Sequence, residues 1–254
     1  PECLGLGIAV VFLCHIICLF GYYQLTGFTV VERWITPFFA YVLSGVFLGF
    51  ADDVLELRWR DKLIFPFFFS ILLIVNYQGS TQIQLPKFIQ AVSPWPAIEL
   101  GAVFYIYLIC LSIFCFNSIN IYAGISGLES GQSLVIGISI MLENLICIAR
   151  GLNAEENFVS LVFLGPFCAT SFALLRANRV ESKTFVGDTY CYFAGCVFAA
   201  CAIIGKFPIK VMLFFLPQLF NFLISIPQLI GIVHCPRHRL PTMDLKSMKM
   251  TSTF

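Results

Sequence analysis

The stretch I-E-L-G-A-V-F-Y-I-Y-L-I-C-L-S-I-F-C-F-N at residues 98–117 determines the class of fold. Glu99 is its single charged residue, and the rest is almost entirely apolar. An α-helix needs about 20 mostly apolar residues to cross the hydrocarbon core of a bilayer. This stretch therefore predicts a membrane-spanning helix.

The whole chain shares this apolar character. Of its 254 residues, 59% are hydrophobic and 11% are charged, and its mean hydropathy is +0.90. A soluble domain carries roughly 25% charged residues, and a membrane β-barrel would need alternating polarity that these runs lack. We predict an all-α, polytopic transmembrane helical bundle. Its eight spans are expected at about residues 4–22, 36–51, 62–77, 98–117, 131–149, 157–176, 189–206 and 210–233.

The distribution of basic residues predicts the orientation. Eight spans place ten of the 15 Lys and Arg on the side of the N-terminus and five on the other side. Cytoplasmic loops carry an excess of Lys and Arg, so the richer side is expected to face the cytoplasm. The formal net charge is +1 and the chain has no basic run, so nothing indicates a nucleic-acid partner.

An acidic pair ends the second predicted span, within G-F-A-D-D-V-L at residues 49–55. Asp52 and Asp53 can bind a divalent cation, or one can act as a base whose pKa is tuned by the other. If the helix continues to Glu56, that residue shares a face with Asp52. The alternative for the pair is a solvated helix end with local ion pairs.

Two asparagines close the fourth span, at the start of N-S-I-N-I-Y-A-G-I-S-G-L-E at residues 117–129. Asn117 and Asn120 lie one helical turn apart, and their amide oxygens can ligate Mg²⁺ or hold a sugar or base. Gly124 and Gly127 permit a tight turn or the close approach of a ligand. Helix packing through interhelical amide bonds remains open as the alternative.

Two further stretches lie on the same predicted side. Asp188 opens the seventh span and is a candidate metal ligand or simply an N-cap. Arg237, His238 and Arg239 follow the eighth span and form a candidate anion site or a cluster that touches lipid headgroups. All four polar stretches together suit a metal-assisted reaction on a phosphorylated substrate.

These motifs, together with F-V-G-D-T-x-C-Y-F-A-G at 185–195 and C-P-R-H-R at 235–239, resemble one family in content and order. They are similar to the polyprenyl-phosphate sugar-1-phosphate transferases (glycosyltransferase family 4 type). The eukaryotic branch is the closest in pattern: it is tunicamycin-sensitive and acts on UDP-N-acetylglucosamine (UDP-GlcNAc) and dolichyl phosphate. The resemblance implies a Mg²⁺-dependent membrane enzyme of the endoplasmic reticulum with a cytosolic active site.

The implied reaction transfers GlcNAc-1-phosphate to dolichyl phosphate, giving GlcNAc-PP-dolichol and UMP in the first step of N-glycan precursor assembly. The family has about ten spans, so residues 1–254 are expected to be a single membrane domain without the first span, the C-terminal cytosolic domain and the last span. Membrane lipid is an implied partner, and a homodimer is compatible with the resemblance.

The resemblance also assigns roles to residues. Asn120 and Asp188 match the Mg²⁺ ligands, and Asp52, Asp53 and Lys62 match catalytic residues. The residues that match the substrate-binding site are Glu2, Asn117, Gly124, Ser126, Phe185, Arg237, His238 and Arg239. Within the last set, Phe185 matches the aromatic residue that stacks on uracil, and Gly124 lies in the same nucleoside pocket.

Two positions depart from the family pattern, because Ser126 and Glu56 stand where asparagine is expected. Other functions also stay open. A bacterial-type relative that acts on undecaprenyl phosphate is disfavoured, because the loop holds Arg237-His238-Arg239 in place of a histidine-rich sequence. A transporter or a non-catalytic lipid-binding scaffold is the alternative from another class, although transporters place polar residues near the bilayer midplane. An inactive truncated homologue is the remaining alternative.

Overall fold

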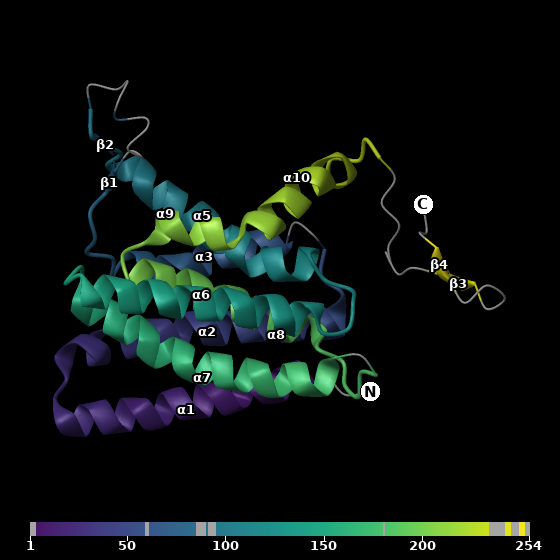
Figure 1. The fold of residues 1–254 in the computed structure, drawn as a ribbon, viewed down its shortest axis with the longest axis horizontal. Coiled ribbons are helices and arrows are strands. Elements are labelled where there is room, and N and C mark those ends of the chain that lie inside the picture. The colour runs from purple at the N-terminus through teal and green to yellow at the C-terminus, as the bar shows by residue number, and fades with distance from the viewer. Residues whose placement is uncertain are drawn as a thin grey trace.

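Long antiparallel helices form the body of the computed structural model (Figure 1). The structure describes residues 4–58, 61–84, 90, 95–179, 181–233, 242–244 and 249–251. The helices are α1 (Leu4–Thr26), α2 (Thr29–Leu55), α3 (Asp61–Ile74), α5 (Ala102–Ile121), α6 (Leu128–Ala149), α7 (Ala154–Asn178), α8 (Gly187–Ile204), α9 (Pro208–Phe214) and α10 (Leu216–Leu229). Short antiparallel pairs join β1 (Gln82–Gln84) to β2 (Ala97–Glu99) and β3 (Thr242–Asp244) to β4 (Lys249–Thr251).

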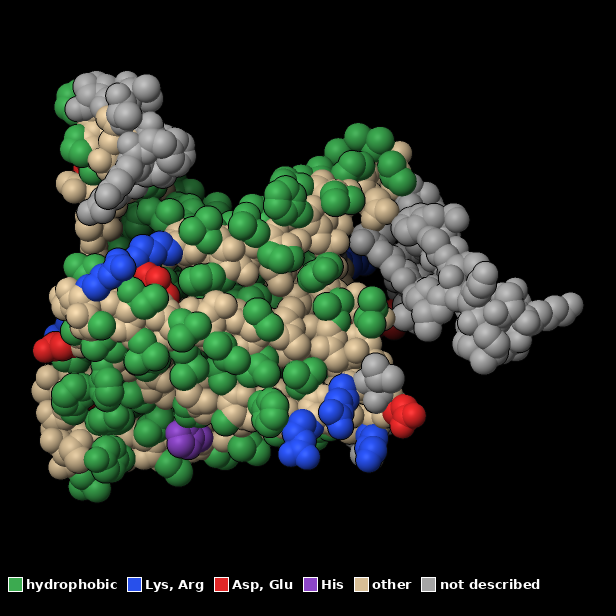
Figure 2. Space-filling model, in the orientation of Figure 1, with side chains coloured by type: hydrophobic (Ala, Val, Ile, Leu, Met, Phe, Trp, Pro, Cys, Tyr) green, Lys and Arg blue, Asp and Glu red, His purple; other side chains and the backbone are tan. Residues whose placement is uncertain are grey.

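The predicted multi-pass helical membrane protein is confirmed, with an approximate number of spans. Within the described residues, six helices are long and apolar enough to cross a membrane, and the bent pair α9–α10 makes a seventh. The expected third span is α3, whose 14 residues extend only about 21 Å, less than the ~30 Å hydrocarbon core. Figure 2 shows hydrophobic side chains over the visible flank and charged ones gathered near the two ends.

The expected last span is broken. The axes of α9 and α10 differ by 77°, and the break lies at Phe215. Pro217, in the first turn of α10, lacks a backbone N–H and its ring would clash with the carbonyl group four residues earlier. A straight helix cannot continue through it, so α10 leaves the bundle at an angle (Figure 1).

Helix α8 is the centre of the bundle and packs against α1, α2, α5 and α7. Every residue of α8 except Asp188 is buried. Gly49 of α2 allows the closest approach, since a Cβ atom at that position would lie 2.5 Å from the Cα atom of Thr189. Asp188 is therefore the one polar, incompletely buried residue on a helix otherwise enclosed by protein.

Helix direction gathers three of the four predicted polar stretches at one end of the bundle, and the fourth, residues 235–239, lies outside the described residues. Helices α2, α5 and α7 end there and α1, α3, α6 and α8 begin there (Figure 1). We call this the site end. A single-domain organisation with further flanking segments stays a prediction.

Candidate functional site

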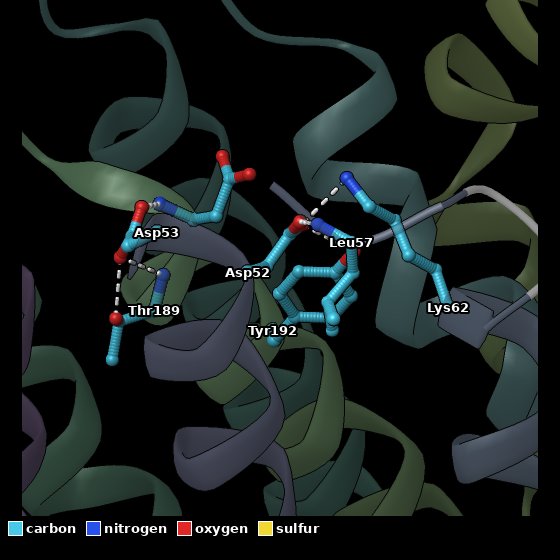
Figure 3. Close-up of polar contacts among 7 residues, drawn as sticks. Asp52, Asp53, Leu57, Lys62, Thr189 and Tyr192 are labelled. Carbon is cyan, nitrogen blue, oxygen red and sulfur yellow. Dashed lines mark hydrogen bonds and ion pairs between the residues drawn. The ribbon is translucent and has the colours of Figure 1, made fainter. Parts of the chain in front are cut away.

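The acidic pair at the end of α2 separates into two carboxylates with different partners (Figure 3). Asp52 is buried, with 3% of its surface exposed, and its Oδ2 atom lies 2.6 Å from Lys62 Nζ. The same oxygen accepts the hydroxyl group of Tyr192 at 3.1 Å, and Oδ1 accepts the backbone N–H of Leu57 at 3.1 Å. Asp52 therefore fixes the Lys62 ammonium group at the site end.

Asp53 caps α8 from the neighbouring helix. Its Oδ1 atom accepts the backbone N–H of Asp188 at 2.7 Å, and its Oδ2 atom accepts the backbone N–H and the hydroxyl of Thr189 at 3.0 and 2.5 Å (Figure 3). The first N–H groups of a helix have no partner inside it and favour a negative charge. The cap of α8 comes from Asp53, so the alternative that Asp188 is the N-cap is wrong; the N-cap position belongs to Val186.

The Asp188 carboxyl group lies among the other charges of the site. It lies close to the carboxyl groups of Asp52 and Asp53 and to the ammonium group of Lys62. Tyr192 links this group to α5, because its hydroxyl also lies within hydrogen-bonding reach of the Asn120 amide. The predicted metal ligands and catalytic residues thus belong to one connected polar cluster.

A metal ion fits this cluster by the chemistry of its donors. Mg²⁺ is usually held by one or two carboxylates, with other oxygens and substrate phosphates completing its shell. The cluster offers the Asp188 carboxyl and the Asn120 amide beside the acidic pair. Among the described residues, no group of three or more His, Cys, Asp or Glu side chains forms a protein-only metal cage, and Mg²⁺ bound with a phosphorylated substrate does not need one.

A pocket of about 200 Å³ adjoins the cluster. Gly124, Ser126 and Phe185, predicted from the resemblance to bind the nucleoside, all line it together with Asp188. Phe185 is 59% exposed, so one face of its ring is available to a ligand. The structure therefore joins the expected nucleoside residues to the expected metal ligand.

Hydrogen bonds hold the loops around this pocket. The backbone N–H of Gly124 donates to Glu129 Oε1 at 2.8 Å, and that of Gly127 donates to Asn178 Oδ1 at 2.8 Å. Both glycines have positive φ angles, +110° and +81°, which favour residues without a Cβ atom. Asn178 also donates to the carbonyl group of Thr184 at 2.8 Å, so it joins the two pocket loops.

Asn117, Glu56 and four residues outside the described part of the chain are the predicted positions that the structure does not join to this pocket. Asn117 is buried and donates to the carbonyl group of Ile113 in its own helix at 2.9 Å, and it is not among the pocket residues. Helix α2 ends at Leu55 and Glu56 has a left-handed φ of 48°, so the shared helical face of Asp52 and Glu56 is wrong. Four predicted substrate-binding residues lie outside the described residues: Glu2, Arg237, His238 and Arg239.

Sequence reasoning missed several residues of the site. Thr189 and Tyr192 lie inside the F-V-G-D-T-x-C-Y motif, and their spacing of one helical turn was the available signal. Asn178 ends α7 and has no such motif, so only the fold reveals its role.

Comparison with known proteins finds one matching family model and relatives that carry the same enzyme name. Residues 34–206 match the family model described as glycosyl transferase family 4. The chain is 43% identical, over 98% of its length and 66% of the relative's, to the UDP-N-acetylglucosamine–dolichyl-phosphate N-acetylglucosaminephosphotransferase of Dictyostelium discoideum. The protein of that name from Schizosaccharomyces pombe is 40% identical, over 84% of this chain and 49% of its own length.

A bacterial relative is more distant. The phospho-N-acetylmuramoyl-pentapeptide-transferase of Caldicellulosiruptor bescii is 25% identical, over 69% of this chain and 53% of its own. The chain thus spans between about half and two thirds of the length of the curated relatives described here.

Proposed function

This chain belongs to glycosyl transferase family 4, and from that membership we propose that it transfers GlcNAc-1-phosphate from UDP-GlcNAc to dolichyl phosphate. The products are GlcNAc-PP-dolichol and UMP, and the reaction is the first step of N-glycan precursor assembly. One observation carries the proposal: Asp188 belongs both to the charged cluster and to the lining of the pocket. The cluster contains Lys62, Asp52 and Tyr192, with Asp53 as the cap of α8. The pocket contains Gly124, Ser126 and Phe185. The names of the eukaryotic relatives support the choice of substrates.

The proposed step is an in-line displacement at phosphorus. An oxygen of dolichyl phosphate attacks the β-phosphorus of UDP-GlcNAc and forms the new P–O–P bond. The bond from the β-phosphorus to the bridging oxygen breaks, and UMP leaves with the electron pair. A phosphate monoester has its second pKa near 6, so it is largely ionised at pH 7 and needs alignment and charge neutralisation more than a strong base.

Lys62 is the described cation best placed for this neutralisation. Its ammonium group has three N–H donors, and its bond to Asp52 uses one of them. Tyr192 and the Leu57 N–H hold Asp52 in place, which limits the motion of the lysine. The remaining donors are available to phosphate oxygens.

Mg²⁺ is the proposed cofactor, held by Asp188 and Asn120. When bound, it would neutralise charge on the phosphate oxygens. The hydrogen bond from the Asp188 backbone N–H to Asp53 holds the start of α8 against the end of α2, and it thereby fixes the position of the Asp188 carboxyl group.

The substrates would occupy different surfaces. Uracil would stack on the exposed ring of Phe185 beside Gly124 and Ser126. Arg237, His238 and Arg239 are proposed for the pyrophosphate and sugar. The bent α9–α10 pair is proposed to border the dolichyl chain, since Asn221 of α10 donates to the carbonyl group of Ile121 at 3.3 Å near the site.

We place the protein in the endoplasmic reticulum membrane, with the site end in the cytosol. The predicted excess of Lys and Arg on that side supports this orientation. A homodimer stays a prediction.

The test uses membranes from cells that express the protein, supplied with dolichyl phosphate and UDP-GlcNAc labelled in the sugar. The expected product is a labelled lipid that partitions into organic solvent, and tunicamycin should prevent its formation. No lipid product above that of membranes without the protein would contradict the proposal.

A further inference from the structure

A second and larger cavity, of about 520 Å³, lies at the end of the bundle opposite the site end. Its walls come from the loop after α3, the start of α5, the turn between α6 and α7, and the turn from α8 into α9. Figure 2 shows blue and red side chains together near this end, apart from the blue group at the other end. The proposed reaction uses none of these residues.

Hydrogen bonds hold the walls together. The amide group of Asn157, which is fully buried, donates to the carbonyl groups of Asn153 at 2.9 Å and Gly205 at 3.3 Å. It thereby ties the α6–α7 turn to the α8–α9 turn. The hydroxyl of Tyr107 on α5 donates to the carbonyl group of Pro208 at 2.9 Å. The cavity is therefore fixed by the fold before any ligand enters.

Two lysines of this cavity, Lys206 and Lys210, each form an ion pair. Lys206 Nζ lies 2.5 Å from Glu156 Oε1, and Lys210 Nζ lies 2.6 Å from Glu143 Oε1. Both lysines line the cavity, whereas neither glutamate does. Each ammonium group uses one of its three N–H donors on its glutamate, so each lysine retains two N–H donors for an anion.

An apolar path leads away from the same cavity. Phe104 and Phe207 contribute aromatic walls, and Ile209, which also lines the cavity, is 37% exposed. Leu213 follows one turn later on the same face of α9 and is 64% exposed. The surface thus offers cationic donors at the end of the bundle and an exposed apolar strip beside them.

We propose that this cavity binds the headgroup of an anionic phospholipid, with its phosphate between Lys206 and Lys210 and an acyl chain along Ile209 and Leu213. The ends of a membrane bundle lie at the depth of the lipid headgroups, and lysine side chains reach that depth along their apolar stems. A free phosphate ion shares the anion chemistry and lacks an apolar part, so the two ligands are separable by experiment.

The test measures the thermal midpoint of the purified protein in detergent, without substrate and without catalysis. Phosphatidylglycerol is expected to raise the midpoint, because a ligand that binds only the folded state stabilises it. Phosphatidylcholine and inorganic phosphate are expected to raise it much less. A rise with either control as large as that with phosphatidylglycerol would overturn the assignment to an anionic lipid.

Substitutions test whether the rise in thermal midpoint with phosphatidylglycerol depends on this cavity. Lys210→Gln combined with Glu143→Gln removes one ion pair without leaving a lone carboxylate, and it should reduce the phosphatidylglycerol response by about half or more. Arg176→Gln is the control, an exposed cation near the opposite end of the bundle and outside the cavity lining, and should leave the response unchanged. An unchanged response in the double variant would overturn the site.

A measurement on the unaltered protein covers the case in which the double variant does not fold. A photoactivatable phosphatidylglycerol should label peptides within residues 205–213. Labelling confined to other peptides would count against the cavity.

Discussion

Asp53 Oδ1 accepts the backbone N–H of Asp188 at 2.7 Å, although 135 residues separate the two in the chain. The neighbouring Asp52 instead binds Lys62 and Tyr192. The acidic pair therefore has divided roles: Asp53 fixes the start of α8, and Asp52 fixes the lysine. The sequence left these roles open.

Replacing Asp53 with alanine should remove the cap of α8. The loss of a helix cap costs about 0.5–2 kcal/mol, and here turnover should also fall because the Asp188 backbone loses its anchor. Thermal unfolding and transferase activity are measured together. Glu181→Ala, which removes an exposed acid at the same end, is the control and should change neither. Unaltered stability in Asp53→Ala would contradict the capping role.

The phenol of Tyr192 should position Asp52 without touching substrate. Tyr192→Phe removes a hydrogen bond of about 1.5–3 kcal/mol to a charged acceptor, and it should lower kcat by roughly tenfold with little change in KM for UDP-GlcNAc. Tyr190→Phe is the matched control, because this buried tyrosine of the same helix bonds Ser171 at 2.9 Å instead. Equal losses of activity in both variants would reduce the role of Tyr192 to packing.

Close packing of α2 on α8 should set the geometry of the site. Gly49→Ala places a Cβ atom 2.5 Å from Thr189 Cα, so the helices must separate and turnover should fall by on the order of tenfold or more. Gly165→Ala on α7 meets no atom within 4 Å and should be neutral or slightly stabilising. Full activity in Gly49→Ala would show that the site tolerates this displacement.

The ring of Phe185 should contribute to nucleotide affinity. Stacking of a base on an aromatic side chain is worth about 1–3 kcal/mol, so Phe185→Ala should raise KM for UDP-GlcNAc by about tenfold or more. Phe172→Ala removes a similarly exposed ring from α7, away from the pocket lining, and serves as the comparison. Steady-state kinetics in which both variants keep the KM of the parent would argue against stacking.

The apolar runs predicted the helices well because membrane spans need long stretches without charge. Apolarity alone did not show that α9 and α10 differ in direction by 77°; the local signal for that bend is Pro217, which prevents a straight helix from continuing. Successive spans alternate in direction, and this correctly predicted that the three described polar stretches lie at one end of the bundle (Figure 1).

Local pattern identified Asp52, Asp53 and Asp188 as candidates, the family resemblance added Lys62, and the fold shows their contacts. Which carboxylate bonds the lysine and which caps α8 depends on the rotation of α2 against α8, and no motif encodes that rotation. The left-handed backbone of Glu56 likewise follows from the end of α2, whereas helical spacing suggested a shared face with Asp52.

The fate of the β-phosphorus of UDP-GlcNAc tests the central claim most directly. With radioactive phosphorus in the β-phosphate, membranes containing the protein should move the label into dolichol-linked product and release unlabelled UMP. Asp188→Asn should slow this transfer by on the order of 10²-fold or more. Label retained in UDP while a sugar-bearing lipid forms, or near-normal transfer by Asp188→Asn with Mg²⁺ present, would contradict the account.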